Sequence, residues 1–124
     1  MSDYSPLKGT TGFKRILNAT GYSLAGFKAA YQHEAAFRQV VWINIILIPI
    51  TFFVDVSSVE QALMIGVCLL AMIVELFNSA LEAVVDRVSL ELHPLSKNAK
   101  DMGSAAQFVA QAIIFFTWMV ILFK

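Results

Sequence analysis

The sequence is short of charge, and it contains few residues that could form covalent or metal cross-links. Only 15% of its 124 residues are charged and 58% are hydrophobic, whereas an ordinary soluble domain is about one quarter charged and about half apolar. This composition excludes disorder, which requires low hydrophobicity, and it argues against an independent soluble monomer. The length leaves room for one domain. We therefore expect a small membrane protein whose sites borrow surface from a second copy.

The chain has one cysteine, Cys68, which excludes an internal disulfide. One cysteine and two distant histidines, His33 and His93, also exclude a zinc cluster of the usual spacing. A carboxylate site for a hard cation stays open. Nine basic and nine acidic residues give zero net charge, and there are no lysine and arginine runs. Nucleic acid is therefore not an expected partner.

Three long apolar stretches each predict a membrane-spanning helix, at about residues 35–56, 62–81 and 102–123. About 20 apolar residues are needed to cross the hydrocarbon layer, which the second and third stretches provide. The first stretch is marginal and contains Pro49, which we expect to kink it. A helix is favoured at membrane depth because it satisfies its own backbone hydrogen bonds.

Residues 12–34 predict an amphipathic surface helix that follows an N-terminal tail at residues 1–11. Apolar residues recur there at helical spacing and are interleaved with basic and amide side chains. Such a helix is typical of the membrane interface. Because Gly21 weakens a continuous helix, we expect a break near it. With the three spans of residues 35–124, the expected fold is an all-α integral membrane protein.

The basic residues predict the orientation of the spans. Residues 1–39 hold five lysines and arginines and the loop expected at 82–101 holds three, whereas the loop at 55–61 holds none. Basic residues are enriched on the cytoplasmic side of membrane proteins. We therefore expect the N-terminus and the second loop to be cytoplasmic.

The second apolar stretch carries polar residues along one line. Glu75 and Glu82 are seven residues apart, which separates them by about 20° around a helix and about 10 Å along it. Asp86 continues this line, and Asn78 and Ser79 flank it. Because an ionised carboxylate in hydrocarbon costs several kcal/mol, Glu75 is expected to face a bundle interior, a partner or water.

This polar stripe admits more than one interpretation. In a structural role, Glu75 and Asn78 would hold helices together by hydrogen bonds. In a catalytic role, Glu75 would act as a general base, and Glu82 with Glu34 would hold a divalent cation that carries the phosphates of a nucleotide. Spacing alone also leaves an ion or proton path open, since the sequence has no phosphate-binding glycine loop of the usual kind.

Two segments resemble the prokaryotic diacylglycerol kinase family. They are IVELFNSALEAVVDRV at residues 73–88 and KNAKDMGSAA at residues 97–106. Together they carry the pattern E-x-x-N-S-A-x-E-x-x-x-D with a downstream A-K-D-x-x-x-A. Residues 10–39 are similar to the Gram-negative branch of the family, so the likeness covers nearly the whole chain from Thr10 onward.

The resemblance implies a lipid kinase. It would transfer the γ-phosphate of ATP, with Mg²⁺, to the hydroxyl of diacylglycerol and form phosphatidic acid in the bacterial inner membrane. It would be a homotrimer of three-span subunits whose active sites are built between subunits. The alternatives are an undecaprenol kinase, against which the long N-terminal match argues, and a non-enzymatic membrane bundle.

The resemblance also implies roles for individual residues. Glu75 matches the general base, Asn78 supports it, and Glu34 and Glu82 match the metal ligands. The residues that match positions handling ATP are Arg15, Tyr22, Glu34, Glu82, Glu91, His93, Lys100 and Asp101. Those that match the lipid side are Arg15, Ala19, Arg38, Glu75 and Ser104. Leu24 and Val40 depart from the tryptophan and glutamate expected there, which bears on lipid preference.

Overall fold

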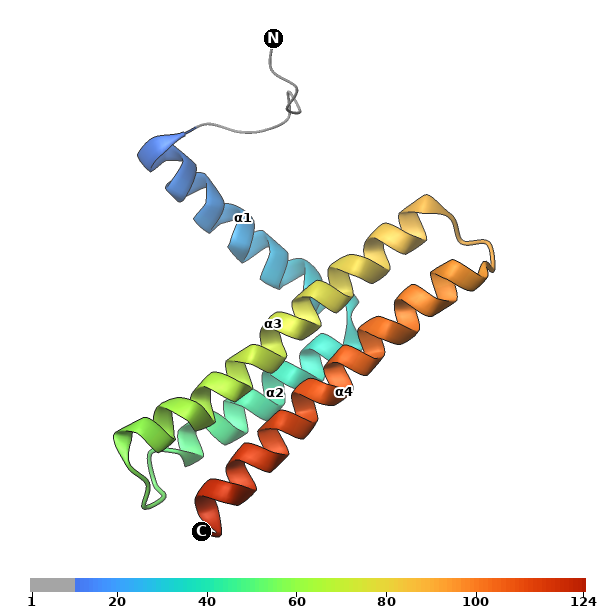
Figure 1. The fold of residues 1–124 in the computed structure, drawn as a ribbon. Helices are drawn as coiled ribbons and strands as arrows, with labels where there is room; N and C mark the ends of the chain where they lie inside the picture. Colours follow the sequence, from blue (N-terminus) through green and yellow to red (C-terminus); the bar gives the residue numbers. More distant parts are fainter. Residues whose placement is uncertain (1–10) are drawn as a thin grey trace.

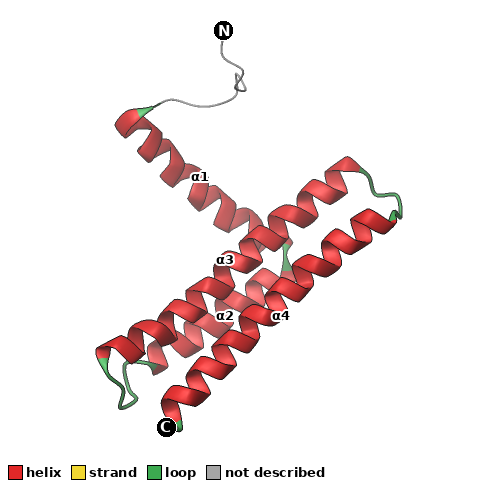
Figure 2. Ribbon diagram, viewed as in Figure 1, coloured by secondary structure: helices red, strands yellow, loops and turns green. Residues whose placement is uncertain are grey.

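The protein is all-α over residues 11–124, the part that the computed structural model describes. The helices are α1 (Gly12–His33), α2 (Ala35–Ile50), α3 (Ser58–Val88) and α4 (Pro94–Leu122). Only helices and connecting loops occur among these residues (Figure 2). In Figure 1, α2, α3 and α4 lie together as a bundle from which α1 projects at an angle. The tail expected at residues 1–11 lies outside the described residues, apart from Thr11.

The core of the bundle is one stripe of residues on α3 and another on α4. The residues buried on α3 are Met64, Cys68, Ala71, Glu75 and Ser79, and those on α4 are Gly103, Ala110, Ile114, Trp118 and Ile121. Their spacing of mostly three or four positions keeps each set on one helical face. Trp118 Nε1 donates a hydrogen bond to the Met64 carbonyl at 3.2 Å. Asn44 Nδ2 donates to the Cys68 carbonyl at 3.0 Å and so connects α2 to the same stripe.

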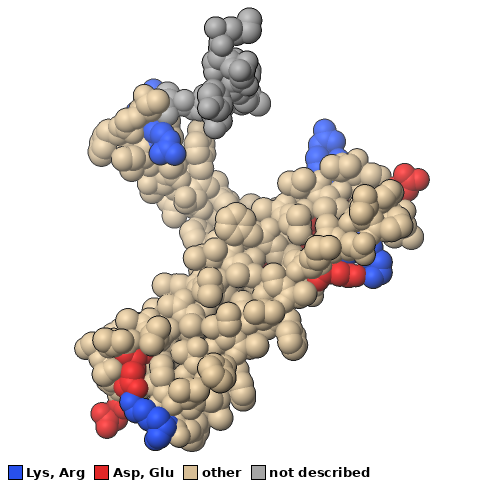
Figure 3. Space-filling model, viewed as in Figure 1, with Lys and Arg blue, Asp and Glu red and all other residues tan. Residues whose placement is uncertain are grey.

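Two of the helices, α3 and α4, are long and apolar enough to cross a membrane. The bundle carries its charged residues towards its two ends, and the surface between the ends is largely uncharged in Figure 3. α2 is shorter than the stretch expected at 35–56, because it ends at Ile50. Pro49 has no N–H to donate, and the chain tightens after it into a turn in which Phe52 N donates to the Pro49 carbonyl at 3.1 Å. A third membrane span therefore stays a prediction.

The surface helix expected at residues 12–34 is present as α1, but the expected break at Gly21 is wrong, since the helix runs through it. A glycine inside a helix costs only about 1 kcal/mol, which is too little to interrupt the surrounding hydrogen bonds. Ala30 is the buried residue of α1. Its last turn is closed by Arg38, whose Nη1 donates to the carbonyls of Tyr31 at 2.7 Å and Gln32 at 3.3 Å.

The polar loop expected at residues 82–101 is mostly helical, which corrects the sequence-based boundaries. α3 continues to Val88 and α4 begins at Pro94, so the connection is Ser89–His93. The extension of α3 contains neither glycine nor proline, and its charged residues are compatible with a helix. At the start of α4, His93 Nδ1 accepts a hydrogen bond from Leu95 N at 3.1 Å, and Pro94 suits the first helical position. The polar residues of this end are thus carried on helices.

Candidate active site

Glu75 lies in the interior of the bundle, where its side chain faces α4. The residue is 2% exposed. Gln107 Nε2 donates to Glu75 Oε2 at 2.8 Å and to the Ala71 carbonyl at 3.2 Å. Gln111 Nε2 in turn donates to Gln107 Oε1 at 2.8 Å. We call Glu75, Gln107 and Gln111 the buried polar chain. It gives Glu75 the internal partner that a carboxylate at this depth requires.

Asn78 lies one turn farther along α3, against Gly103 of α4. Among residues 11–124, no hydrogen-bond partner is present for the buried Asn78 Oδ1 or for the buried Ser79 Oγ. A Cβ added at Gly103 would overlap the Asn78 carboxamide and lie 3.3 Å from Leu81 Cδ2. The absence of a side chain at Gly103 therefore lets α4 approach α3 beside Asn78. An unpaired buried polar group costs about 1–3 kcal/mol, so Asn78 is a polar group available to a ligand.

The carboxylates along α3 become more exposed towards the end of the helix. Glu75 is buried and Glu82 is of intermediate exposure, while the Asp86 side chain is 50% exposed. Glu34, at the junction of α1 and α2, belongs to the same cluster. Burial raises the pKa of the Glu34 carboxyl, and the negative charges of Glu82 and Asp86 raise it further. The fold therefore brings Glu34 close enough to α3 for these acidic groups to repel one another.

This cluster fits a divalent cation that also has other ligands. Among the described residues, no group of three or more His, Cys, Asp or Glu side chains could hold a metal ion. Mg²⁺ usually binds one or two carboxylates and completes its shell with water and substrate phosphates. Glu34 and Glu82 could supply two carboxylates of that kind, and the mutual repulsion of the acidic groups would be relieved by a cation.

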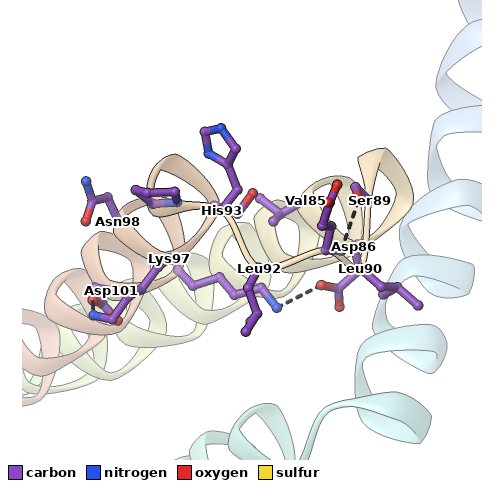
Figure 4. Close-up of a pocket in the computed structure, with 13 residues that line it drawn as sticks. Val85, Asp86, Ser89, Leu90, Leu92, His93, Lys97, Asn98 and Asp101 are labelled. Carbon is purple, nitrogen blue, oxygen red and sulfur yellow. Dashed lines mark hydrogen bonds and ion pairs between the residues drawn. The ribbon is translucent and has the colours of Figure 1, made fainter.

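A pocket of about 890 Å³ lies between the end of α3, the Ser89–His93 connection and the start of α4 (Figure 4). Four residues predicted to handle ATP line it: Glu91, His93, Lys100 and Asp101. Its other charged residues are Asp86 and Lys97. The pocket is therefore built from both helices at the end of the bundle towards which the polar stripe runs.

Two ion pairs organise the charges of this pocket. Lys100 Nζ lies 2.7 Å from Asp86 Oδ1, which joins α4 to α3 and appears in Figure 4 as the dashed line ending at Asp86. Lys97 Nζ lies 2.6 Å from Asp101 Oδ2 within α4, and these side chains are 76% and 62% exposed. Exposed pairs contribute only about 0–1 kcal/mol, so both lysines can exchange a carboxylate for a phosphate at little cost.

Other residues predicted for the site do not meet this pocket within one chain. Arg15, Ala19 and Tyr22 are exposed on α1, and no residue of α1 lines the pocket. Ser104 is exposed on α4. Arg38, predicted for the lipid side, directs its guanidinium to the last carbonyls of α1. A single chain therefore brings together the acidic and nucleotide groups but leaves the predicted groups of α1 apart.

The sequence analysis missed Gln107 and Gln111. The signal was present, because two amide side chains four residues apart in the third apolar stretch share one face of a helix. The argument applied to Glu75, that polar groups at membrane depth require partners, applies to them equally. What the sequence did not reveal was the register of α4 against α3, which brings Gln107 to Glu75.

Comparison with known proteins agrees with this arrangement. The sequence profile described as prokaryotic diacylglycerol kinase matches residues 21–122. The chain belongs to the prokaryotic diacylglycerol kinase family. It is 73% identical to a diacylglycerol kinase of Pseudomonas aeruginosa over 118 residues, which cover 95% of this chain and 96% of that relative. The family resemblance inferred from residues 73–88 and 97–106 is thereby confirmed.

More distant members of the diacylglycerol kinase family match over nearly the same length. The chain is 49% identical to a diacylglycerol kinase of Haemophilus influenzae over 114 residues, covering 92% of this chain and 97% of the relative. It is 47% identical to a diacylglycerol kinase of Escherichia coli over 115 residues, covering 93% and 94%. The likeness thus includes α1 as well as the bundle.

Proposed function

We propose that this protein transfers the γ-phosphate of ATP to the hydroxyl of diacylglycerol and forms phosphatidic acid. The observation that carries the proposal is the polar stripe of α3. It begins at Glu75, buried in the bundle, and ends at Asp86, in the charged pocket. A lipid hydroxyl at membrane depth and a nucleotide in water can therefore approach one another along a single helix. Relatives named diacylglycerol kinase support this choice of lipid.

Glu75 is the base in this reaction. Its carboxylate takes the proton of the lipid hydroxyl while that oxygen forms a bond to the γ-phosphorus. The bond from the γ-phosphorus to the bridging oxygen breaks, and ADP leaves with its electron pair. A positioned general base contributes about 10²–10⁴-fold to such a step. Asn78, with its unpartnered Oδ1 beside Glu75 in sequence, supports the reacting groups.

The pocket holds the nucleotide. Lys100 contacts the phosphates by exchanging its bond to Asp86, and Glu91, His93 and Asp101 line the remaining space. Glu34 and Glu82 would hold Mg²⁺, the metal that the acidic cluster fits. When bound, the cation neutralises charge on the phosphates. Arg15, Ala19, Arg38 and Ser104 contribute to the lipid side, where Leu24 and Val40 affect the choice of lipid.

The active enzyme is a homotrimer of three-span subunits in the bacterial inner membrane. Two observations support a composite site: α1 contributes nothing to the pocket of its own chain, and Arg15 and Tyr22 are exposed on it. These groups would reach the pocket of a neighbouring copy. The N-terminus and the Ser89–His93 connection are cytoplasmic. Labelling of Ser96→Cys from outside intact cells would contradict that orientation.

The activity is tested with γ-labelled ATP and purified protein in mixed micelles. Diacylglycerol and undecaprenol are compared at equal mole fraction, with magnesium and with a chelator. We expect labelled phosphatidic acid, formed only with the metal. Preferential labelling of undecaprenol would establish the alternative lipid kinase. Absence of label in both lipids would favour a non-enzymatic bundle that uses the polar stripe as an ion path.

A further inference from the structure

We propose that Gln107 is a positioning residue for Glu75 and that Gln111 fixes the orientation of Gln107. This proposal rests on the proposed function, in which Glu75 accepts the proton of the lipid hydroxyl. It is carried by the three hydrogen bonds of the buried polar chain, which connect α4 to the reacting carboxylate.

The orientation of the Gln107 amide is determined by its neighbours. The Ala71 carbonyl oxygen can only accept, so the group that faces it at 3.2 Å must be Nε2. The same nitrogen has a second hydrogen, which it donates to Glu75 Oε2 at 2.8 Å. A flipped amide would turn its oxygen towards two acceptors. Gln111 strengthens the preference, because its Nε2 donates to Gln107 Oε1 at 2.8 Å.

This fixed donor acts on the reacting group in two ways. A hydrogen bond donated to a carboxylate favours its charged form, which is the form that accepts a proton. Holding Oε2 against α4 also fixes the plane of the carboxylate, so that Oε1 is the oxygen we assign to the lipid hydroxyl. A lysine or arginine at position 107 would stabilise the charge too strongly for Glu75 to act as a base, whereas a neutral amide supplies a moderate effect.

The charges around Glu75 make such a donor necessary. The charged groups whose fields act on it are Glu82, from its own helix, and Glu34, from the junction of α1 and α2. Both are acidic and oppose its ionisation. From α4, the neutral Gln107 faces Glu75. From α2, the buried polar residue is Asn44, which is neutral and donates instead to the Cys68 carbonyl. Gln107 therefore favours ionisation of the base where its acidic neighbours oppose it.

The test uses the full chain in mixed micelles with diacylglycerol and MgATP, and measures kcat and KM across a pH series. In Gln107→Met, which keeps the length of the side chain but has no donor, we expect the acidic limb of the kcat profile to move up by about one pH unit. Below the limb, kcat falls about tenfold for each unit of that shift. KM for ATP stays unchanged. Gln107→Glu, which replaces the donor with an acceptor, is expected to move the limb farther.

Two further variants separate positioning from packing. Gln111→Leu removes only the bond that orients Gln107, so its shift is expected in the same direction but smaller. Asn44→Leu is the matched control, because it also removes a buried bond from an amide to a backbone carbonyl, but one without connection to Glu75. It is expected to leave the limb where it is in the unchanged protein.

An unchanged acidic limb in both Gln107 variants would overturn the proposal. If either variant fails to assemble, infrared titration of the Glu75 carboxyl in Gln111→Leu, assigned by difference from Glu75→Gln, still decides: a carboxyl that titrates as in the unchanged protein overturns the proposal. Failure of the proposed function has a different signature, namely no lipid phosphorylation by the unchanged protein or full activity of Glu75→Gln. An active parent, an inactive Glu75→Gln and an unmoved limb would reject the role of Gln107 alone.

Discussion

The buried polar chain and the charged pocket are both built by α3 and α4, but they use different chemistry. At Glu75, one carboxylate is held by neutral amide groups. At the pocket, lysines and aspartates form ion pairs that are exposed to solvent. Bringing a second charge into the bundle would require its desolvation, which often exceeds the gain from pairing. In water the same pair is almost neutral in free energy, so its lysine can be transferred to a phosphate.

The comparison shows that depth along α3 changes what a carboxylate can do. Glu75, Glu82 and Asp86 have similar side chains and lie on one line of the helix, but their exposure increases in that order. The buried group is suited to moving a proton, and the exposed groups are suited to binding cations and orienting lysines. The order follows the two substrates, since one is a lipid and the other is soluble in water.

The strongest test of this comparison is to remove the charge from the buried end and then from the exposed end. Glu75→Gln preserves size and hydrogen bonding but cannot accept the proton, so we expect turnover to fall by about 10²–10⁴-fold. Turnover in mixed micelles and molecular mass in detergent are measured together. Asp86→Asn is the matched variant at the exposed end and should lose much less. Near-normal turnover of Glu75→Gln combined with loss of the assembly would make Glu75 a structural residue.

The close packing beside Asn78 predicts the next largest effect. Gly103→Ala introduces a Cβ that overlaps the Asn78 carboxamide, and overpacking of this kind typically costs about 1–3 kcal/mol. We therefore expect a lower midpoint of thermal unfolding in detergent and reduced turnover. Gly66 of α3 has open space at the corresponding position, so Gly66→Ala should be neutral. Equal midpoints for the two variants would show that α4 can move away from Asn78 freely.

Much of this organisation could be predicted from the sequence. The surface helix, the apolar stretches and the line from Glu75 to Asp86 follow from helical spacing, which is a local property. The partner of Glu75 could not be predicted, because the Gln107 bond depends on how α4 is aligned with α3. The ion pair of Lys100 with Asp86 likewise depends on the short connection at residues 89–93. The expected break at Gly21 was wrong because a weak local preference was given too much weight.

In the pocket, the two lysines provide a comparison of their own. Lys100 bridges to α3 through Asp86 and lies on the side of the acidic cluster, whereas Lys97 pairs within α4 with Asp101. We expect Lys100→Met to raise KM for ATP about tenfold, because it removes a charge-assisted bond to phosphate. Lys97→Met, whose side chain is 76% exposed, should change KM by less than about twofold. The reverse order would mean that phosphate lies at the outer side of the pocket.

The smallest effect is expected at Glu34, where stability and metal binding should have opposite signs. Burial and the charges of Glu82 and Asp86 raise the pKa of the Glu34 carboxyl above its ordinary value in the unfolded chain. The ionised group therefore opposes folding at pH values above the raised pKa, and this penalty disappears as the pH falls through that pKa towards the ordinary value. In the absence of metal, Glu34→Gln should unfold at a slightly higher temperature near neutral pH, and this advantage should vanish on acidification.

Magnesium should reverse the order of these two proteins. A ligand that binds the folded state raises its stability in proportion to the logarithm of ligand concentration over the dissociation constant. With Glu34 as a ligand, added Mg²⁺ with a non-hydrolysable nucleotide should raise the unfolding midpoint of the parent more than that of Glu34→Gln. The matched variant is Glu91→Gln, whose exposed carboxylate lines the pocket outside the acidic cluster and should respond to Mg²⁺ as the parent does. Equal stabilisation of the parent and Glu34→Gln would assign the cation to Glu82 and the phosphates without Glu34.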